Sequence, residues 1–551
     1  MKELVGKGVS NGIAIGKLYF YNNALKEIPE YEVEDVDKEM ERYKSSLLRA
    51  KTRLWQIYDS ACKKVTKNES VIFRTHIMIL EDSKFIELVE SNIRERKNAE
   101  YAVFQAATTL SNLFRNLDDD YFKSRCSDII DAAHILLEVL QNKNERKFRT
   151  DDGESFIIAA NDLMPSDTIS FNKDHLLGFV TNDGAQNSHS AILARTMGVP
   201  SIIQIDEPLT DYHGVMAIID GQLGKVIIDP DVNIMALYNA KRERYIKQQQ
   251  RLKRQIGLRS ETKNKQYIRL TADITRLDEL EKAKNNDAEG VGLYRSEYLF
   301  MCREKCPDEE EQLETYKTVL KHFGEHGVVI DTANGSSAKG FQYLDIPKEK
   351  NPALGFRGIR ISLENREFLR TQLRALYRAS EFGKLSIVLP MISSMEEIEY
   401  VQREIDKVKS ALRLNGVKYD NNVKVGVMVE TPAAALISDE ICKRVDFVSV
   451  NTDNLIQYTL AMDRENPKLE DFYRPYHTAV KKLIKMTIDN AHKFGKKVSI
   501  CGNLASDTGA TGMFLAMRAD ELVLMPSKIL KVKATVREMD TSNSLSLIKE
   551  L

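Results

Sequence analysis

The stretch Lys424-Val425-Gly426-Val427-Met428-Val429-Glu430-Thr431-Pro432 reads as a short apolar strand that ends at a carboxylate. Apolar runs of the same kind recur along the second half of the chain, separated by helical patterns. They occupy residues 267–270, 290–293, 328–330, 386–389, 447–450, 497–500 and 521–524. Strands that alternate with helices form parallel sheets, and eight such units predict a (β/α)8 barrel.

Polar side chains follow several of these predicted strands. They are Arg295, Asp331, Glu430, Asn451 through Asn454, and Cys501. In a (β/α)8 barrel the residues just past the strand ends line one mouth, where the active site lies. The alternative is that they are unrelated loop residues. We favour the first interpretation, because charged groups and a thiol follow so many strand ends.

The segment before the barrel is polar. After Pro230 a predicted helix rich in Lys, Arg and Gln runs to about Leu258. Its charge argues against burial, so we expect an interdomain helix. The charged side chains are better explained as a solvated helix face than as a binding patch.

The first 230 residues divide into helical and mixed segments. Residues 8–20 combine glycines with apolar alternation, which predicts a loop followed by a strand. From about Val36 to Val139 apolar residues recur at helical spacing, and neither Pro nor Gly occurs between Pro29 and Gly153. We expect a bundle of about four helices there. Short apolar runs at 156–160, 178–180, 217–221 and 225–228 then predict a small α/β unit.

One histidine lies in a segment suited to holding phosphate. The run Asp183-Gly184-Ala185-Gln186-Asn187-Ser188-His189-Ser190-Ala191-Ile192-Leu193-Ala194-Arg195 places it at a predicted helix start. Ser188 or Asn187 can cap that helix, and its free N–H groups and dipole favour an added anionic group. A histidine at this place is often only a surface or capping residue. The alternative hypothesis is a phosphohistidine.

The totals limit the classes of function. A chain of 551 residues is expected to form roughly two to four domains. Lys plus Arg number 80 and Asp plus Glu 81, a balance that argues against a general grip on nucleic acid or membranes. No run approaches the roughly 18 apolar residues of a membrane span, and six scattered cysteines suit a reducing compartment. We therefore expect a cytoplasmic protein that binds neither nucleic acid nor membrane.

The chain resembles a known family over essentially its whole length. The matching segments include residues 8–16, 73–82, 161–168, the His189 loop, 292–301, 351–357, 428–435 and 457–464. Taken in order, they are similar to Enzyme I of the bacterial phosphoenolpyruvate-dependent sugar phosphotransferase system, the phosphoenolpyruvate-protein phosphotransferase.

The resemblance implies an α/β multidomain fold, with a helical bundle inserted beside a small swivelling phosphohistidine α/β domain and followed by a C-terminal (β/α)8 TIM barrel. The phosphohistidine domain would comprise residues 1–20 and 150–230, and the bundle, which docks the phosphocarrier HPr, residues 21–149. Residues 231–262 would be the linker helix. Residues 263–551 would be the barrel that binds phosphoenolpyruvate and forms a homodimer.

The implied reaction is a two-step relay. His189 would take the phosphoryl group from phosphoenolpyruvate through an imidazole nitrogen and pass it to a histidine of HPr. Thr168 matches the residue that orients this imidazole, a role that needs a hydroxyl within reach.

The barrel residues would bind the substrate and a metal ion. Arg295 and Arg464 match anion clamps, because a guanidinium suits phosphate or carboxylate oxygens. Glu430 matches a ligand of Mg²⁺, the implied cofactor, and Cys501 matches the acid that protonates the enolate carbon as pyruvate forms. Asp453 and Asn454 lie in the segment that would contact substrate, and Asn454 also occupies the position of a second metal ligand.

The chain departs from the family at this site. Asp331 stands where the family has an anion-binding arginine, and two like charges about 4 Å apart cost on the order of 4 kcal/mol near a protein surface. The family sequence Gly-Thr-Asn-Asp becomes Asn451-Thr452-Asp453-Asn454, which moves the carboxylate by one residue. Metal affinity is therefore expected to fall unless Asp453 swings in. Residues 128–134 also lack arginines that the family shows, which bears on HPr docking.

Three functions remain open at this stage. The first is a working Enzyme I with a rebuilt site, and the second is a catalytically weak or inactive paralogue that regulates or binds HPr. The third is a relative such as pyruvate phosphate dikinase or phosphoenolpyruvate synthase. Those enzymes need a large nucleotide-binding domain, for which residues before 150 leave no room. The joint presence of His189, Arg295, Glu430, Arg464 and Cys501 favours the transferase.

Overall fold

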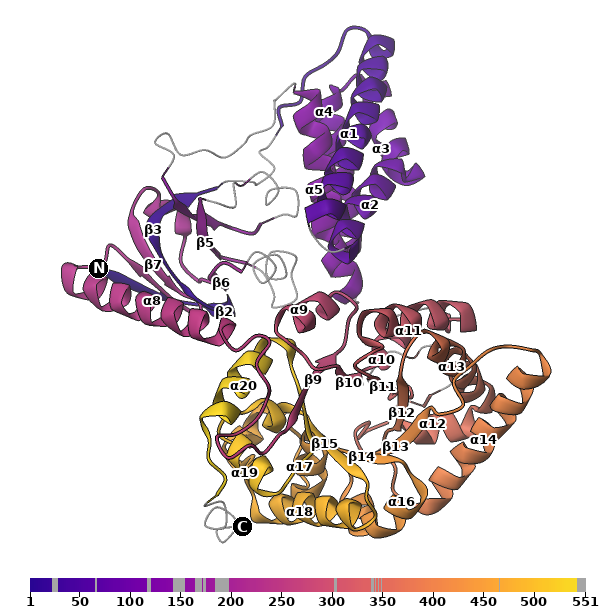
Figure 1. Cartoon of the computed structure of the whole chain (residues 1–551). Coiled ribbons are helices and arrows are strands. Elements are labelled where there is room, and N and C mark those ends of the chain that lie inside the picture. Colours follow the sequence, from indigo (N-terminus) through magenta and orange to yellow (C-terminus); the bar gives the residue numbers. More distant parts are fainter. Residues whose placement is uncertain are drawn as a thin grey trace. The chain divides into compact units, whose positions relative to one another are not determined.

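The computed structural model divides the chain into two compact units, Met1–Gln249 and Gln250–Leu551 (Figure 1). It describes residues 1–21, 28–64, 67–115, 120–141, 154–163, 171, 175–183, 198–301, 305–337, 341, 343–344, 346–347, 349–464 and 466–542.

The second unit is a closed barrel of parallel strands. They are β9 (Arg269–Ile274), β10 (Val291–Tyr294), β11 (Val328–Asp331), β12 (Leu385–Leu389), β13 (Lys424–Val429), β14 (Phe447–Asn451), β15 (Lys497–Cys501) and β16 (Glu521–Leu524). The ring closes where Leu522 of β16 pairs with Leu270 of β9. The predicted (β/α)8 barrel is therefore confirmed.

Helices surround the barrel strands (Figure 1). They are α9 (Glu279–Asn285), α10 (Glu297–Phe300), α11 (Glu309–Phe323), α12 (Ile359–Glu364), α13 (Arg366–Ala379), α14 (Met395–Leu414), α15 (Pro432–Leu436), α16 (Ser438–Arg444), α17 (Thr452–Leu460), α18 (Thr478–Lys493), α19 (Thr511–Ala516) and α20 (Ile529–Glu538). Inside the ring, Leu293, Val388, Met428 and Val523 form a buried apolar cluster with Cys501. This packed interior leaves the strand ends as the place for chemistry.

The first barrel strand differs most from its predicted bounds. The sequence predicts a first barrel strand over 267–270, whereas β9 continues to Ile274. Thr271 and Asp273 interrupt the apolar run, which is why the apolar pattern stops at Leu270. Both polar side chains are tolerated in the strand because they form hydrogen bonds. Thr271 Oγ1 donates to Glu521 Oε1 at 2.5 Å, and Asp273 accepts from Arg295.

The first unit contains an eight-stranded sheet. Its strands are β1 (Lys2–Val5), β2 (Lys7–Ser10), β3 (Ile13–Phe20), β4 (Phe156–Ala160), β5 (Leu176–Thr181), β6 (Ser201–Ile203), β7 (Met216–Asp220) and β8 (Lys225–Ile228), in the order β1-β8-β7-β3-β4-β5-β6-β2. The glycine at position 8 of the glycine-rich N-terminal segment is required by packing, because a Cβ there would lie 2.1 Å from the carbonyl oxygen of Gly221. The strands expected in the small α/β unit are thus observed.

A helical bundle is inserted in the sequence between β3 and β4, which pair side by side in the sheet. The described helices of this bundle are α1 (Val36–Lys64), α2 (Lys67–Glu81), α3 (Ser83–Arg94), α4 (Ala99–Arg115) and α5 (Asp120–Leu140). The expectation of about four helices is therefore too low. The extra break occurs at Asp82, whose side chain accepts from the backbone N–H groups of Lys84 and Phe85 and so caps α3 without Pro or Gly.

Helix α8 (Val232–Lys253) follows the sheet. The sequence argument against its burial is wrong for its first turns. Ile234, Met235 and Tyr238 pack against Ile218 and Ile227 of the sheet, and Tyr238 is 8% exposed. Most of the charged residues of this segment lie further along the helix. The composition of the whole segment is therefore polar, although its first turns have a short apolar face.

Candidate active site at the barrel mouth

The carboxyl ends of five strands bring polar side chains to one mouth of the barrel. Arg295 and Glu430 directly follow β10 and β13, while Asp331, Asn451 and Cys501 are the last residues of β11, β14 and β15. Because side chains alternate along a strand, Arg295 lies two positions beyond Leu293 and Glu430 two positions beyond Met428, and both of these apolar residues belong to the interior of the ring.

Arg295 is held by a carboxylate that the sequence analysis missed. Its Nε and Nη2 donate to the two carboxylate oxygens of Asp273 at 2.9 and 2.7 Å. This paired geometry fixes the plane of the guanidinium. The signal for Asp273 was hidden because the predicted strand stopped at Leu270, three residues too early for Asp273 to count as a strand end.

Asp331 is buried next to Ser296, the residue that follows Arg295. It is 2% exposed, and its Oδ1 accepts from the backbone N–H of Ser296 at 2.7 Å. Burial, together with the negative charge of Glu297, raises the pKa of Asp331 to about 8. The carboxyl is therefore largely neutral at pH 7, and the repulsion expected from replacing an arginine is weakened.

Glu430 is fully buried and accepts hydrogen bonds from three N–H groups. Its Oε1 accepts from the backbone N–H of Met391 at 2.6 Å, and its Oε2 accepts from Asn451 Nδ2 at 3.2 Å and from Asn454 Nδ2. Asn451 also starts α17, since its Oδ1 accepts from the backbone N–H groups of Asp453 and Asn454. One asparagine thus fixes both the buried carboxylate and the next helix.

Asp453 faces away from Glu430. Its Oδ1 accepts from the backbone N–H of Asn503 at 2.9 Å, and its Oδ2 lies 3.8 Å from Arg464 Nη1. Burial raises the pKa of Asp453 above its usual value. The carboxylate of Asp453, one residue earlier than the family's aspartate, therefore lies on the side of the mouth occupied by the Arg464 guanidinium.

Cys501 lies at the floor of the mouth with no exposed surface. Burial raises the pKa of its thiol well above the ordinary value, against an opposing effect of the Arg295 charge. Its sulfur lies 3.9 Å from the Ser449 hydroxyl. The group is a neutral thiol at physiological pH, which is the form that can release a proton.

Arg357 is a second residue that the sequence analysis did not assign to the site, although the Asn351–Arg357 motif contained it. It is 8% exposed, and its Nη2 and Nη1 donate to Asn334 Oδ1 at 3.2 Å and to the Tyr458 hydroxyl at 3.3 Å. Both of these partners are neutral, so this buried cation is suited to meet an anion.

Comparison with known proteins covers the chain from end to end. Residues 5–125 match the model of the PEP-utilising enzyme N-terminal region, 153–224 that of the mobile domain, and 248–541 that of the PEP-binding domain. The phosphoenolpyruvate-protein phosphotransferase of Priestia megaterium is 37% identical over 544 residues, which cover 98% of this chain and 95% of the relative. The Bacillus subtilis protein of that name is 35% identical over 558 residues, covering 100% of this chain and 97% of the relative. The chain belongs to the phosphoenolpyruvate-protein phosphotransferases.

This membership makes the chain an enzyme, a transferase of the phosphoenolpyruvate-dependent phosphotransferase system, and nothing in the comparisons favours the inactive paralogue. PEP-utilising enzymes work with a metal ion. Within the described ranges, no group of three or more His, Cys, Asp or Glu residues is placed to hold one. Across the same ranges no helix is both long and apolar enough to pass through a membrane.

Two residues predicted for this phosphotransferase, His189 and Thr168, lie outside the described residues. Of the other predicted site residues, the structure brings Arg295, Glu430, Asn454 and Cys501 to the barrel mouth, with Asp453 and Arg464 beside them.

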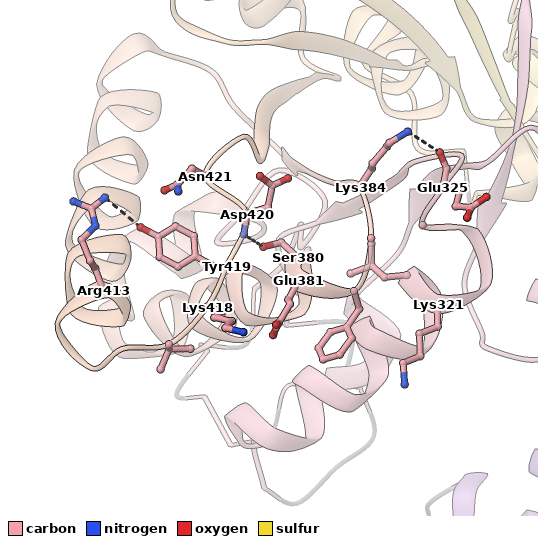
Figure 2. Close-up of a pocket in the computed structure, with 15 residues that line it drawn as sticks. Lys321, Glu325, Ser380, Glu381, Lys384, Arg413, Lys418, Tyr419, Asp420 and Asn421 are labelled. Atoms are coloured by element: carbon pink, nitrogen blue, oxygen red, sulfur yellow. Dashed lines mark hydrogen bonds between the residues drawn. The ribbon is translucent and has the colours of Figure 1, made fainter.

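A cavity of about 1000 Å³ lies at the other end of the barrel (Figure 2). Three of its lining residues, Glu325, Lys384 and Asp420, lie in the loops that precede β11, β12 and β13. In (β/α)8 enzymes the chemistry occurs at the carboxyl ends of the strands. This cavity is therefore separate from the site of the phosphotransferase.

Proposed function

We propose that this chain transfers the phosphoryl group of phosphoenolpyruvate to His189 and then to a histidine of the phosphocarrier HPr. In the first step a bond forms between an imidazole nitrogen and phosphorus, while the bond between phosphorus and the enol oxygen breaks. The enolate of pyruvate leaves with the electron pair. Thr168 would orient the imidazole through its hydroxyl.

Three cations would receive the anionic substrate. Arg295 is preorganised by its two bonds to Asp273, and Arg357 is buried among neutral partners. Arg464 completes the set, at 3.8 Å from Asp453. Guanidinium groups suit phosphate and carboxylate oxygens, and a mouth that excludes water strengthens each contact.

The observation that best supports this chemistry is the sealed thiol of Cys501. Its raised pKa keeps the proton on sulfur at neutral pH. Cys501 Sγ would give this proton to the terminal carbon of the enolate, which yields pyruvate, and the thiolate would recover a proton from solvent. Protonation of this carbon converts the enolate to the ketone, whose oxygen accepts a phosphoryl group far less readily.

Mg²⁺ is the cofactor that the family resemblance implies, with Glu430 and Asn454 as its candidate ligands. A hard cation prefers several oxygen ligands, whereas Asn454 presents its N–H to Glu430. These two residues are a poor fit for Mg²⁺ in this arrangement. The steps proposed above accordingly use the side chains of the protein itself.

The regions would share the work as the resemblance implies. Residues 1–20 and 150–230 would carry the phosphohistidine, residues 21–149 would dock HPr, and residues 231–262 would link them to the barrel of residues 263–551. The barrel would also form a homodimer. We place the reaction in the cytoplasm, a reducing compartment of the kind that the six scattered cysteines suit.

The test is incubation of the full chain with phosphoenolpyruvate, following pyruvate release and acid-labile phosphate with and without HPr. We expect labelling that HPr discharges. His189→Ala should abolish the label and retain the thermal unfolding of the wild type. The matched control is His175→Ala, which removes another histidine of the first unit and should retain the label. Labelling of the His189→Ala protein would exclude His189 as the carrier.

A further inference from the structure

Glu430 has a complete set of hydrogen-bond donors at the place where a metal ion would have to bind. Its side chain has no exposed surface. The donors are the backbone N–H of Met391 and the side-chain amides of Asn451 and Asn454. All three are N–H groups, so both carboxylate oxygens are already satisfied without a cation.

The orientation of Asn454 follows from the chemistry of its neighbour. A carboxylate can only accept hydrogen bonds, so an amide that faces it must present its NH₂ group. The amide oxygen of Asn454, which is the only atom of that side chain that could coordinate a hard cation, then points away from Glu430. A cation bound to both residues would have to break this contact and turn the amide.

The neighbouring carboxylate cannot readily replace Asn454. Asp453 is held by the backbone N–H of Asn503 at 2.9 Å and lies 3.8 Å from Arg464 Nη1. Moving it toward Glu430 would break the first contact and place two carboxylates together. In the free protein, Glu430 is therefore the only carboxylate that this arrangement offers to a cation, which gives little charge for a divalent cation to bind before the substrate arrives.

Arg357 supplies positive charge to the same region. Its Nη1 lies 3.3 Å from the Tyr458 hydroxyl, and that hydroxyl is 3.9 Å from the sulfur of Met391, whose backbone N–H binds Glu430. The Nε of Arg357 is buried with no hydrogen-bond partner. A buried cation with an unused donor is prepared for an anionic ligand.

We infer that this chain binds phosphoenolpyruvate without requiring a divalent cation, with the Asn454 amide bridging to Glu430 and Arg357 supplying the positive charge. The inference rests on the proposed function, since it concerns the same substrate at the same mouth. It also makes a prediction about the free protein, which tests it separately. A carboxylate at position 454 would repel Glu430 and create a demand for a cation that the asparagine removes.

Calorimetric titration of phosphoenolpyruvate into the full chain tests the inference, once in EDTA and once in Mg²⁺. For the wild type we expect dissociation constants that agree within about twofold. For Asn454→Asp we expect binding about tenfold weaker in EDTA and restored by Mg²⁺. Asn421→Asp is the matched control, because it adds the same charge at the cavity on the opposite face (Figure 2) and should leave the wild-type behaviour unchanged.

Loss of wild-type binding in EDTA with recovery in Mg²⁺ would overturn the inference. Titration of the free protein with Mn²⁺, followed by electron paramagnetic resonance, gives a second result that needs neither substrate nor the variant to fold. Saturable micromolar Mn²⁺ binding by the wild type would contradict the premise that the contact between Asn454 and Glu430 excludes a cation from the free protein, and its absence would support that premise. A protein that binds phosphoenolpyruvate under neither condition would contradict the proposed function, and the Mn²⁺ result would still decide the metal question.

Discussion

At the residue scale, Asp331 makes stability depend on pH. Its pKa is raised from 3.8 to about 8 by burial and then by the charge of Glu297, while Arg295 and the Ser296 hydrogen bond act in the opposite direction. The folded chain therefore keeps a proton on Asp331 that the unfolded chain releases above pH 4. The contribution to stability is complete below the unfolded pKa and is lost as pH rises toward 8.

We accordingly expect thermal unfolding to shift to lower temperature between about pH 5 and pH 8. Asp331→Asn should reduce this shift by at least roughly 2–4 °C, because the amide is neutral throughout. Calorimetric scans of the full chain at each pH measure it. Asp420→Asn, a carboxylate at the opposite face of the barrel, is the control and should keep the wild-type slope. Equal slopes for wild type and Asp331→Asn would contradict this account.

The pair Asp453 and Asn454 shows what one position along a chain changes. Asn454 lies on the buried side of α17 and donates to Glu430, whereas Asp453 lies next to Arg464 and Asn503. Exchanging carboxylate and amide between these two positions moves one negative charge from the carboxylate side of the mouth to the guanidinium side. The residue types are preserved, but the chemistry available to a cation is not.

At the element scale, α17 depends for both stability and position on Asn451, the residue that precedes it and caps its start. Asn451 Oδ1 accepts from the backbone N–H groups of Asp453 and Asn454, and its Nδ2 donates to Glu430. Asn451→Ala removes all three contacts and should lower the free energy of unfolding by about 1–2 kcal/mol. Urea unfolding of the full chain measures this loss, and phosphoenolpyruvate titration should show weaker binding.

Asn365→Ala is the comparison for this variant. Asn365 precedes α13 in the same barrel, but its side chain makes no hydrogen bond to that helix start. The same substitution should therefore destabilise the chain less than Asn451→Ala. A loss at Asn365 equal to that at Asn451 would mean that capping does not determine the stability of α17.

Whether a segment is a helix or a strand could be predicted from the sequence wherever its apolar residues followed one regular pattern. The apolar runs at 424–429 and 497–500 recur as β13 and β15 with little change, because buried parallel strands are nearly continuous in apolar residues. Prediction failed where a local contact outweighed the pattern. Asp82 ends one helix and caps the next through its own side chain, and no Pro or Gly marks the boundary.

The sequence predicted which residues lie at the candidate site, but not which of them contact one another. Strand ends identified Arg295, Glu430 and Cys501, since their places follow from the period of the barrel. That Asp273 pairs with Arg295 depends on how neighbouring strands are staggered across the ring. Such a contact joins residues from different strands, and the spacing within either strand does not contain it.

At the scale of the whole molecule, the chain separates into two compact units, Met1–Gln249 and Gln250–Leu551. The barrel ring closes within Gln250–Leu551, and the described residues of the mouth all lie in that unit. The proposed carrier His189 belongs to Met1–Gln249. Substrate binding should therefore need only the second unit, whereas phosphoryl transfer should need both.

A fragment of residues 250–551 should fold and bind phosphoenolpyruvate with a dissociation constant within about threefold of the full chain, because its clamp arginines and their partners are all present. It should form no acid-labile phosphate, since it lacks His189. Circular dichroism, titration and labelling measure the three properties, with full-length His189→Ala as the control that also binds without being labelled. A folded fragment that fails to bind while the full chain binds would mean that the first unit contributes directly to the substrate site.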